Sequence, residues 1–155
     1  MSEEVREMKV IVFRLGDEEY GVPINYVGSI ERMLEITRIP NTPAFIKGVI
    51  NLRGVVTPVI DLRERFGMES ASYSNRTRMI TVHIEEKEVA MIVDEANDVV
   101  DLKEDDVEDP PEVIGSVDTD YVRGVAKLQD RLLILLNLEQ VLSNEEMSQL
   151  SVVDA

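Results

Sequence analysis

The chain has 155 residues, enough for one domain or two very small ones, and its formal net charge at pH 7 is −15. So acidic a chain lacks the basic face that nucleic acids require, and the absence of cysteine excludes disulfides and thiol chemistry. The N-terminus is polar, unlike a signal peptide, and no apolar run approaches the roughly 18 residues that cross a bilayer. We therefore expect a soluble protein that binds no nucleic acid and inserts no segment into a membrane.

The N-terminal part of the chain has the pattern of a β-hairpin. Residues 8–15 alternate and are rich in β-branched side chains, Gly16-Asp17 supplies a turn, and residues 19–24 predict the return strand. Asn25 is placed to cap a short helical turn that runs through Ser29.

A second hairpin follows a loop. Two prolines predict that residues 38–44 are extended or turning rather than helical. Two apolar runs, residues 48–52 and 55–60, then flank Arg53-Gly54, which is typical of a tight β-turn.

The second hairpin leads into a short helix whose start is repeated later in the chain. Asp61 with Glu64 resembles a capping box, in which the first side chain bonds the backbone of the second residue. Asn137 with Gln140 repeats this arrangement after another pair of apolar runs. We expect a short helix after each pair of strands.

Three further segments lie outside the hairpins. Residues 68–76 are predicted to be a linker, and the acidic residues 101–120, with their double proline, are predicted to form an extended loop. Ser143 with Glu146 forms a further capping box and predicts a C-terminal helix through about residue 150.

The chain repeats itself. Residues 45–66 return as residues 121–142, at an offset of 76, and residues 10–25 align with residues 79–94 at an offset of 69. Two copies of one β unit predict a doubled scaffold with a seam between the copies, and a seam is a natural docking site. We expect a single unit over 8–150 with halves at about 8–67 and 77–142, strands possibly exchanged between them, and flexible tails at 1–7 and 151–155.

Charge is unevenly distributed along the chain. Residues 85–120 carry a net charge of −13, whereas residues 31–65 carry +2. A charged run is usually a solvated face. The alternative is a molecule with differently charged ends, which would orient it among its partners.

No arrangement of residues predicts an active site. His83 lies in an alternating run and aligns with Arg14 of the first copy, so we expect an exposed strand histidine rather than an acid–base group. Glu104-Asp105-Asp106 lacks the spaced oxygens and the turn glycine of a calcium loop. The sequence has no phosphate-binding glycine loop, nucleophile elbow or spaced His/Cys cluster. We expect a binding protein, not an enzyme, with no metal ion or cofactor.

Two groups of residues are candidates for a binding surface. Arg53 occupies a turn position where Asn, Asp or Gly is usual. It is either a solvated turn residue or an arginine held rigidly for a partner's carboxylate or backbone, and its counterpart in the second copy is Gln129. The second group occupies comparable places in the two copies and forms either plain core or the floor of a groove at the seam: Val27, Ile30, Val99 and Val100.

The chain resembles the CheW family of bacterial chemotaxis coupling proteins in four segments: LGDEEYGVPI, TRIPNTPAFIKGVINLRGVVTPVIDLRERFG, IVDEANDVV and DRLLILLNLEQVL. The resemblance covers about residues 8–150, and NTPAFIKGVINLRG is its most specific part. It implies a mainly β fold of two small five-stranded SH3-like β-barrels packed side by side, with short helices and a C-terminal helix.

The resemblance implies a non-enzymatic, cytoplasmic adaptor in chemotaxis signal transduction, associated with receptor arrays at the inner face of the membrane. It would join the cytoplasmic tip of methyl-accepting chemotaxis receptors to the regulatory domain of the histidine kinase CheA. The receptor's helical hairpin would lie in the groove between the barrels. The matching positions are Val27, Ile30, Arg53, Val99 and Val100.

Two kinase-binding surfaces are also implied. One includes Ala44, Phe45 and Val56, and a second, ring-forming surface includes Glu108, Glu112 and Val113. This chain departs from some relatives, which have arginine and phenylalanine in place of Glu108 and Val113 and a glutamate in place of Ser29.

Three other interpretations compete with this one. The chain could be the adaptor half of a CheV-like protein, but such proteins also carry a receiver domain and this chain ends at Ala155. It could be the regulatory module of a kinase, although the start at Met1 argues otherwise. From a different class, it could be a small-ligand enzyme that uses its acidic loop, which nothing in the spacing supports.

Overall fold

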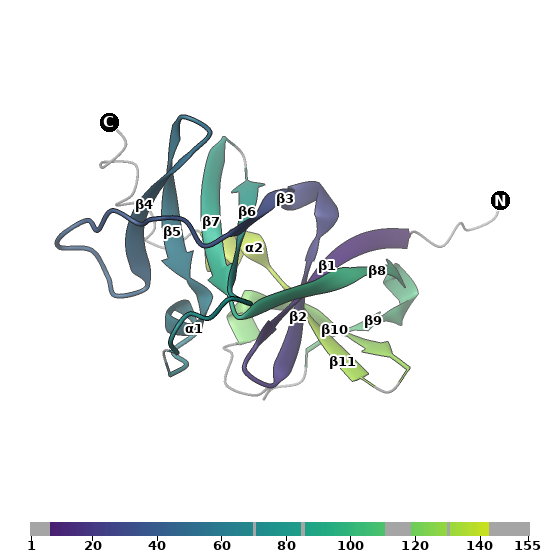
Figure 1. Ribbon diagram of the computed structural model, residues 1–155. Coiled ribbons are helices and arrows are strands. Elements are labelled where there is room, and N and C mark those ends of the chain that lie inside the picture. Colours follow the sequence, from purple (N-terminus) through teal and green to yellow (C-terminus); the bar gives the residue numbers. More distant parts are fainter. Residues whose placement is uncertain (1–6, 70, 85, 111–118, 130, 143–155) are drawn as a thin grey trace.

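The computed structural model describes residues 7–69, 71–84, 86–110, 119–129 and 131–142, and their strands form two sheets (Figure 1). The six-stranded sheet has the order β8-β1-β2-β11-β10-β9 and consists of β1 (Glu7–Leu15), β2 (Glu18–Pro23), β8 (Glu95–Lys103), β9 (Val107–Glu108), β10 (Val122–Leu128) and β11 (Arg131–Leu136). The five-stranded sheet has the order β3-β6-β7-β5-β4 and consists of β3 (Val27–Arg32), β4 (Ile46–Leu52), β5 (Val55–Asp61), β6 (Arg78–Ile84) and β7 (Lys87–Val93). The helices are α1 (Leu62–Arg65), α2 (Leu138–Val141) and the 3-10 helices η1 (Ile24–Tyr26), η2 (Glu104–Asp106) and η3 (Thr119–Tyr121).

The two copies of the repeat exchange their first hairpins. The β1–β2 hairpin of the first copy lies between β8 and β11 of the second, and the β6–β7 hairpin of the second copy lies between β3 and β5 of the first. The parallel contacts are equivalent, because Val59 lies opposite Ala90 in one sheet and Leu135 opposite Gly21 in the other, as the offsets of 76 and 69 require. Each sheet is therefore built from both halves of the chain, an exchange that the sequence had left open.

The middle strands are buried on both faces. In β1, Val10 and Val12 pack into the core of the six-stranded sheet, whereas Ile11 and Phe13 face the other way. Burial on both faces explains why these strands are continuous apolar runs rather than strict alternations. The second face contributes to a cluster between the sheets, here called the central core, whose members include Ile11, Phe13, Tyr20, Ile60, Ile80, Met91, Ile134 and Leu136.

The five-stranded sheet curls so that its two ends approach each other. After β3, the backbone of Thr37 exchanges two hydrogen bonds with Val49 of β4, at N···O distances of 2.8 and 2.9 Å. Gly48 permits this approach, because a Cβ atom there would lie 2.0 Å from the carbonyl oxygen of Thr37. In the six-stranded sheet Gly124, the counterpart of Gly48, lies against β9 in the same way.

The predicted mainly β fold with two halves and short helices is confirmed. It differs from expectation in detail, because the sheets have six and five strands and are not closed barrels. The backbone pairing that brings the two ends of the five-stranded sheet together is an isolated bridge between Thr37, which follows β3, and Val49 of β4. The predicted C-terminal helix, at residues 143–150, lies outside the described residues, as do the tails apart from Glu7, which already belongs to β1.

The two predicted helix caps are present. The Asp61 carboxylate accepts a hydrogen bond from the Glu64 amide, and the Asn137 side chain accepts one from the Gln140 amide, each at 3.3 Å. The reciprocal half of the capping box is replaced by backbone bonds of 2.8 Å, in which the amides of the two capping residues donate to the carbonyl oxygens of Phe45 and Tyr121, respectively. Equivalent caps support a true structural duplication.

Two local predictions were wrong. The helical turn expected from Asn25 to Ser29 stops at Tyr26, and Ser29 belongs to β3, where its amide donates to Oγ1 of Thr81 at 2.8 Å. Pairing with β6 therefore overrides the local capping signal. Within the segment 101–120, which was expected to be a loop, residues 101–108 continue β8 and form η2 and β9, residues 119 and 120 begin η3, and residues 111–118 lie outside the described residues.

Candidate functional site

The edge strands β3 and β8 carry apolar side chains at the seam between the sheets. In antiparallel pairs, directly opposite residues place their side chains on the same face. Ile30 lies opposite Ile80, and Val99 lies opposite Ile11, and both of these partners belong to the central core. Ile30 and Val99, which are 43% and 49% exposed, therefore extend the face of the central core to the surface at equivalent positions of the two halves.

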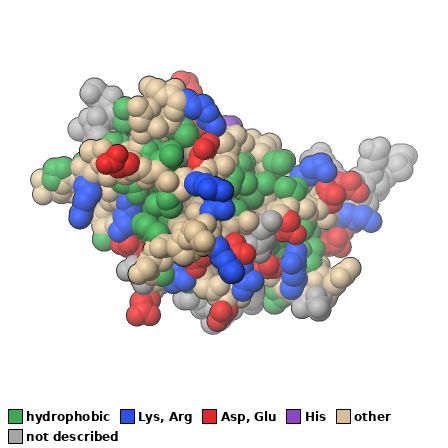
Figure 2. Space-filling view, in the orientation of Figure 1, with side chains coloured by type: hydrophobic (Ala, Val, Ile, Leu, Met, Phe, Trp, Pro, Cys, Tyr) green, Lys and Arg blue, Asp and Glu red, His purple; other side chains and the backbone are tan. Residues whose placement is uncertain are grey.

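The surface around the seam is partly hydrophobic. The space-filling view shows hydrophobic side chains reaching the surface between the region of β3 and that of β1 and β8 (Figure 2). Val27, opposite Val82, is partly buried and packs against the central core. Val100 differs from the other three predicted apolar contacts, because it lies opposite Val10 and packs into the core of the six-stranded sheet. The structure thus gathers Val27, Ile30 and Val99 near the seam and turns Val100 away from it.

Arg53 is held in an unusual backbone conformation. It occupies the turn between β4 and β5 with φ 53°, followed by Gly54 with φ 85°. This left-handed region is costly for a residue with a long side chain. The Asn51 side chain fixes the turn by accepting a hydrogen bond of 2.8 Å from the Gly54 amide. Gln129 has φ 51°, so the second copy has the same turn without the charge.

The Arg53 guanidinium pairs with a residue that the sequence did not single out. Its Nη2 donates a 2.8 Å hydrogen bond to Oε2 of Glu31, which lies on β3. The pair joins the edge strand β3 to the hairpin at the opposite end of the same sheet. The sequence predicts a helical turn at residues 25–29 instead of the start of β3. The pairing register of β3, which brings Glu31 to this position, therefore does not follow from that prediction.

The predicted kinase surfaces divide into exposed and buried residues. Ala44 is exposed and Val56 is 59% exposed, on the loop before β4 and at the start of β5. Phe45 is only 6% exposed and packs in the central core under the Arg65 guanidinium, so its burial gives no support to a direct contact with a partner.

The second predicted kinase surface is described only in part. Glu108 is exposed on β9, 3.8 Å from the Lys127 ammonium. Glu112 and Val113 lie outside the described residues.

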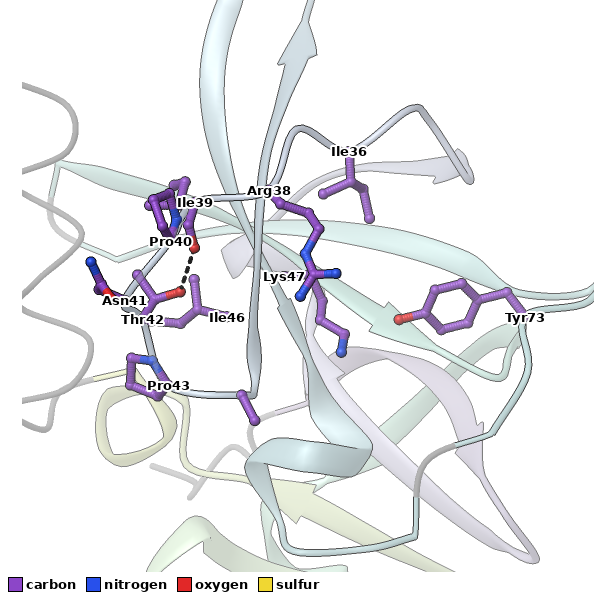
Figure 3. A pocket seen from close by; sticks show the side chains of 11 residues that line it. Ile36, Arg38, Ile39, Pro40, Asn41, Thr42, Pro43, Ile46, Lys47 and Tyr73 are labelled. Carbon is purple, nitrogen blue, oxygen red and sulfur yellow. Dashed lines mark hydrogen bonds between the residues drawn. The ribbon is translucent and has the colours of Figure 1, made fainter.

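A cavity of about 560 Å³ lies beside Ala44. Arg38, Lys47 and Tyr73 line it, and the Tyr73 side chain points toward the two cationic side chains (Figure 3). The Lys47 ammonium is paired with Glu64, whereas Arg38 makes no hydrogen bond or ion pair with any residue that the structure describes. The Tyr73 hydroxyl donates to Asp61 at 2.8 Å, and burial together with this bond raises the pKa of Tyr73. The cavity therefore presents, next to a predicted kinase contact, a cation that is unpaired among the described residues.

A bidentate ion pair ties the two sheets together where the chain crosses between them. Asp94, between β7 and β8, accepts hydrogen bonds of 2.9 and 2.6 Å from Nε and Nη2 of Arg63 and one of 2.8 Å from the Gly16 amide. Partial burial alone would raise the pKa of Asp94, but these bonds and the positive charge of Arg63 outweigh it and lower the pKa below its usual value. The junction connects α1, the first hairpin and the crossover.

The rest of the described chain offers little for chemistry. His83 is exposed on β6, as predicted. Within residues 7–142, leaving aside the gaps noted above, no group of three or more His, Cys, Asp or Glu side chains could hold a metal ion. The same part of the chain contains no helix that is long and apolar enough to cross a membrane.

Known proteins are similar to this chain in both sequence and fold. The family model of the CheW-like domain matches residues 9–146. The chemotaxis protein CheW of Klebsiella aerogenes is 40% identical over 148 residues, covering 96% of this chain and 89% of that protein, and CheW of Bacillus subtilis is 42% identical over 147 residues, covering 94% and 93%. The crystal structure of the scaffolding protein TtCheW from Thermoanaerobacter tengcongensis superimposes with a TM-score of 0.84 at 38% identity, over 91% of this chain and 96% of that one. The chain, with its two exchanged halves and its apolar seam, belongs to the CheW family.

Proposed function

We propose that this protein is a non-enzymatic adaptor that couples the cytoplasmic tip of methyl-accepting chemotaxis receptors to the histidine kinase CheA. It acts in the cytoplasm, at receptor arrays on the inner face of the membrane. The observation that carries this proposal is the pair of equivalent, half-exposed side chains Ile30 and Val99 at the seam between the sheets.

The seam suits one face of an amphipathic helix. Helix recognition requires apolar contacts at the floor of a groove and polar groups at its rim. Val27, Ile30 and Val99 supply the apolar contacts, and Arg53, whose side chain is 67% exposed, supplies a fork of donors for carboxylates or helix carbonyls. Val100 supports the groove from within the six-stranded sheet rather than touching the receptor.

The kinase binds elsewhere on the molecule. Ala44 and Val56 belong to the five-stranded half, and Glu108, Glu112 and Val113 belong to the second half of the chain. Phe45 supports the first of these surfaces from the core. Separate surfaces allow one adaptor to hold receptor and kinase together, which raises the effective concentration of each weak pair. Signals then pass as a shift in the population of active kinase.

A reconstitution assay tests this function. The purified protein is mixed with a soluble fragment that carries the receptor's cytoplasmic helical hairpin and with CheA, and binding is measured by pull-down and kinase activity by ATP-dependent autophosphorylation. We expect the adaptor to bind each partner alone and to raise kinase activity only when both are present. Failure to bind either partner would overturn the proposal.

A further inference from the structure

We infer that Glu31 is a positioning residue: its carboxylate holds the Arg53 guanidinium at the rim of the seam, with the remaining donors of the guanidinium free for an acidic group of the receptor. This inference rests on the proposed function, because it takes Arg53 as a receptor contact. It adds a residue whose role is to act through Arg53 rather than to touch the receptor itself.

The register of β3 places Glu31 where an apolar residue would be expected. Glu31 lies opposite Met79, which belongs to the core of the five-stranded sheet, and its side chain is only 24% exposed. Its counterpart in the second copy, at the offset of 69, is Val100, which packs into the corresponding core. A carboxylate at such a position requires a partner, and Arg53 supplies it at 2.8 Å.

The pair occurs in one half of the molecule only. The counterparts of Glu31 and Arg53 are Val100 and Gln129, so both members of the pair differ between the copies while the backbone of the turn is the same. The fold of the turn therefore does not need the ion pair. A feature that the repeat does not need structurally, and that lies beside the apolar seam, fits a binding role.

The contact leaves most of the guanidinium available. Arginine has five N–H donors in a planar fork. Among the described residues, the bond from Nη2 to Glu31 is the single hydrogen bond that the Arg53 side chain makes. Asn51 fixes the backbone of the turn, whereas the Arg53 side chain is 67% exposed, so that its rotamers are restricted mainly by the bond to Glu31. Glu31 thereby limits the conformations of the Arg53 side chain before the receptor binds.

Holding the guanidinium in advance lowers the entropy lost on binding. Removing the Glu31 charge should therefore weaken receptor binding roughly three- to tenfold, since one long side chain must then be ordered by the receptor. A competing role for Glu31 predicts the opposite change in affinity for the receptor. If Glu31 competed with a receptor carboxylate for Arg53, removing its charge would tighten binding.

The experiment uses the full chain and four variants. Affinity for the soluble fragment carrying the cytoplasmic helical hairpin of a methyl-accepting receptor is measured by calorimetry for the wild type, Glu31→Gln, Arg53→Asn, the double variant, and the control Glu35→Gln, which removes an equal charge from an exposed position just after β3. The motion of the Arg53 side chain is followed in the free protein by ¹⁵N relaxation of its Nε–H group, and thermal unfolding checks that each variant folds.

Positioning predicts three results together. Glu31→Gln weakens binding and increases the motion of Arg53 Nε–H, Glu35→Gln does neither, and Glu31→Gln has no further effect once Arg53 is Asn. Unchanged or tighter binding by Glu31→Gln overturns the inference while leaving the proposed function standing, and so does an effect that persists in the Arg53→Asn background. If the wild type does not bind the receptor fragment at all, the proposed function fails, and the inference fails with it.

Discussion

The Nε atom of Arg65 donates a 2.9 Å hydrogen bond to the carbonyl oxygen of Val141, the residue that occupies the position of Arg65 in the second copy of the repeat. The guanidinium carbon also lies 4.7 Å from the ring centroid of Phe45 and 4.9 Å from that of Tyr121, which are again equivalent positions. One buried side chain therefore lies where the two halves meet, and it contacts both.

Replacing Arg65 should destabilise the protein strongly. Arg65→Ala removes a charged hydrogen bond and two cation–π contacts from a site that is 8% exposed, and we expect the free energy of unfolding to fall by about 2–4 kcal/mol. Urea unfolding measures this change. The control is Arg76→Ala, whose 3.9 Å pair with Glu95 is largely exposed and should contribute less than about 1 kcal/mol. Equal losses for the two variants would contradict the role given to Arg65.

Acid should weaken the junction at Asp94. Because the folded-state pKa of Asp94 lies below its ordinary value of 3.8, its contribution to stability is complete above that value and is lost as the pH falls through it toward the folded pKa. We expect Asp94→Asn to lower the free energy of unfolding at neutral pH by about 1.5–3 kcal/mol. The difference from the wild type should shrink below about pH 4. Denaturant unfolding at a series of pH values measures it, and a difference that stays constant in acid would exclude this assignment.

The two equivalent glycines should not tolerate alanine equally. In Gly48→Ala the new Cβ atom would lie 2.0 Å from the backbone oxygen of Thr37, at a φ of 143°. In Gly124→Ala the nearest atom, at 2.6 Å, is a side-chain methyl of Val107, which can move, although the Glu108 oxygen is at 2.9 Å. We expect both variants to lose stability and Gly48→Ala to lose more, by at least about 1 kcal/mol. Thermal unfolding of the two variants side by side decides the order.

Arg53→Asn should weaken receptor binding while leaving the stability of the protein nearly unchanged. Asparagine tolerates the left-handed turn conformation, so relief of backbone strain should offset the loss of an exposed ion pair, and stability should stay within about 1 kcal/mol of the wild type. Receptor binding should weaken. Gln129→Asn is the matched control, because it makes the same change at the equivalent turn, and it should leave binding unchanged. Normal receptor coupling by Arg53→Asn would remove Arg53 from the proposed site.

Polar substitutions at the seam should reduce receptor binding whether they are made in the first or in the second half of the chain. Ile30→Asn and Val99→Asn each remove half-exposed apolar surface next to the central core, and each should weaken binding of the receptor hairpin about tenfold, with a smaller effect on stability. Leu132→Asn is the control, because Leu132 is 57% exposed at the start of β11, away from the edge strands. Titration with the receptor fragment measures all three. A loss for Leu132→Asn as large as for the seam variants would argue against a specific groove.

Local signals in the sequence sufficed for most hairpins, caps and turns. The apolar runs around Arg53-Gly54 and the caps at Asp61 and Asn137 depend on residues a few positions apart, and the structure confirms them. The internal repeat predicted the doubling because equivalent positions have kept equivalent packing. The prediction around Ser29 was wrong because pairing with Thr81, far away in the sequence, determines that segment.

The candidate site depends on contacts that no local pattern encodes. The sequence marks Ile30 and Val99 as apolar positions, but their common face follows only from the register of β3 on β6 and of β8 on β1. Val100 and Phe45 are equally apolar in the sequence, yet both are turned into cores. Nothing in the sequence distinguishes Glu31 and Arg65 from the other charged residues of the chain. Their importance comes from partners at Arg53 and Val141, which the fold brings to them.

The exchanged hairpins mean that neither half of the chain contains a complete sheet. A lone copy of the repeat would leave its first hairpin without the strands that flank it, and it could bury that hairpin only by trading it with a second, identical chain. The present molecule has the architecture of such a domain-swapped homodimer joined by a peptide link through residues 68–76. Once the two copies share one chain, each can diverge without the other, so a self-complementary pair becomes a molecule with two unlike sides.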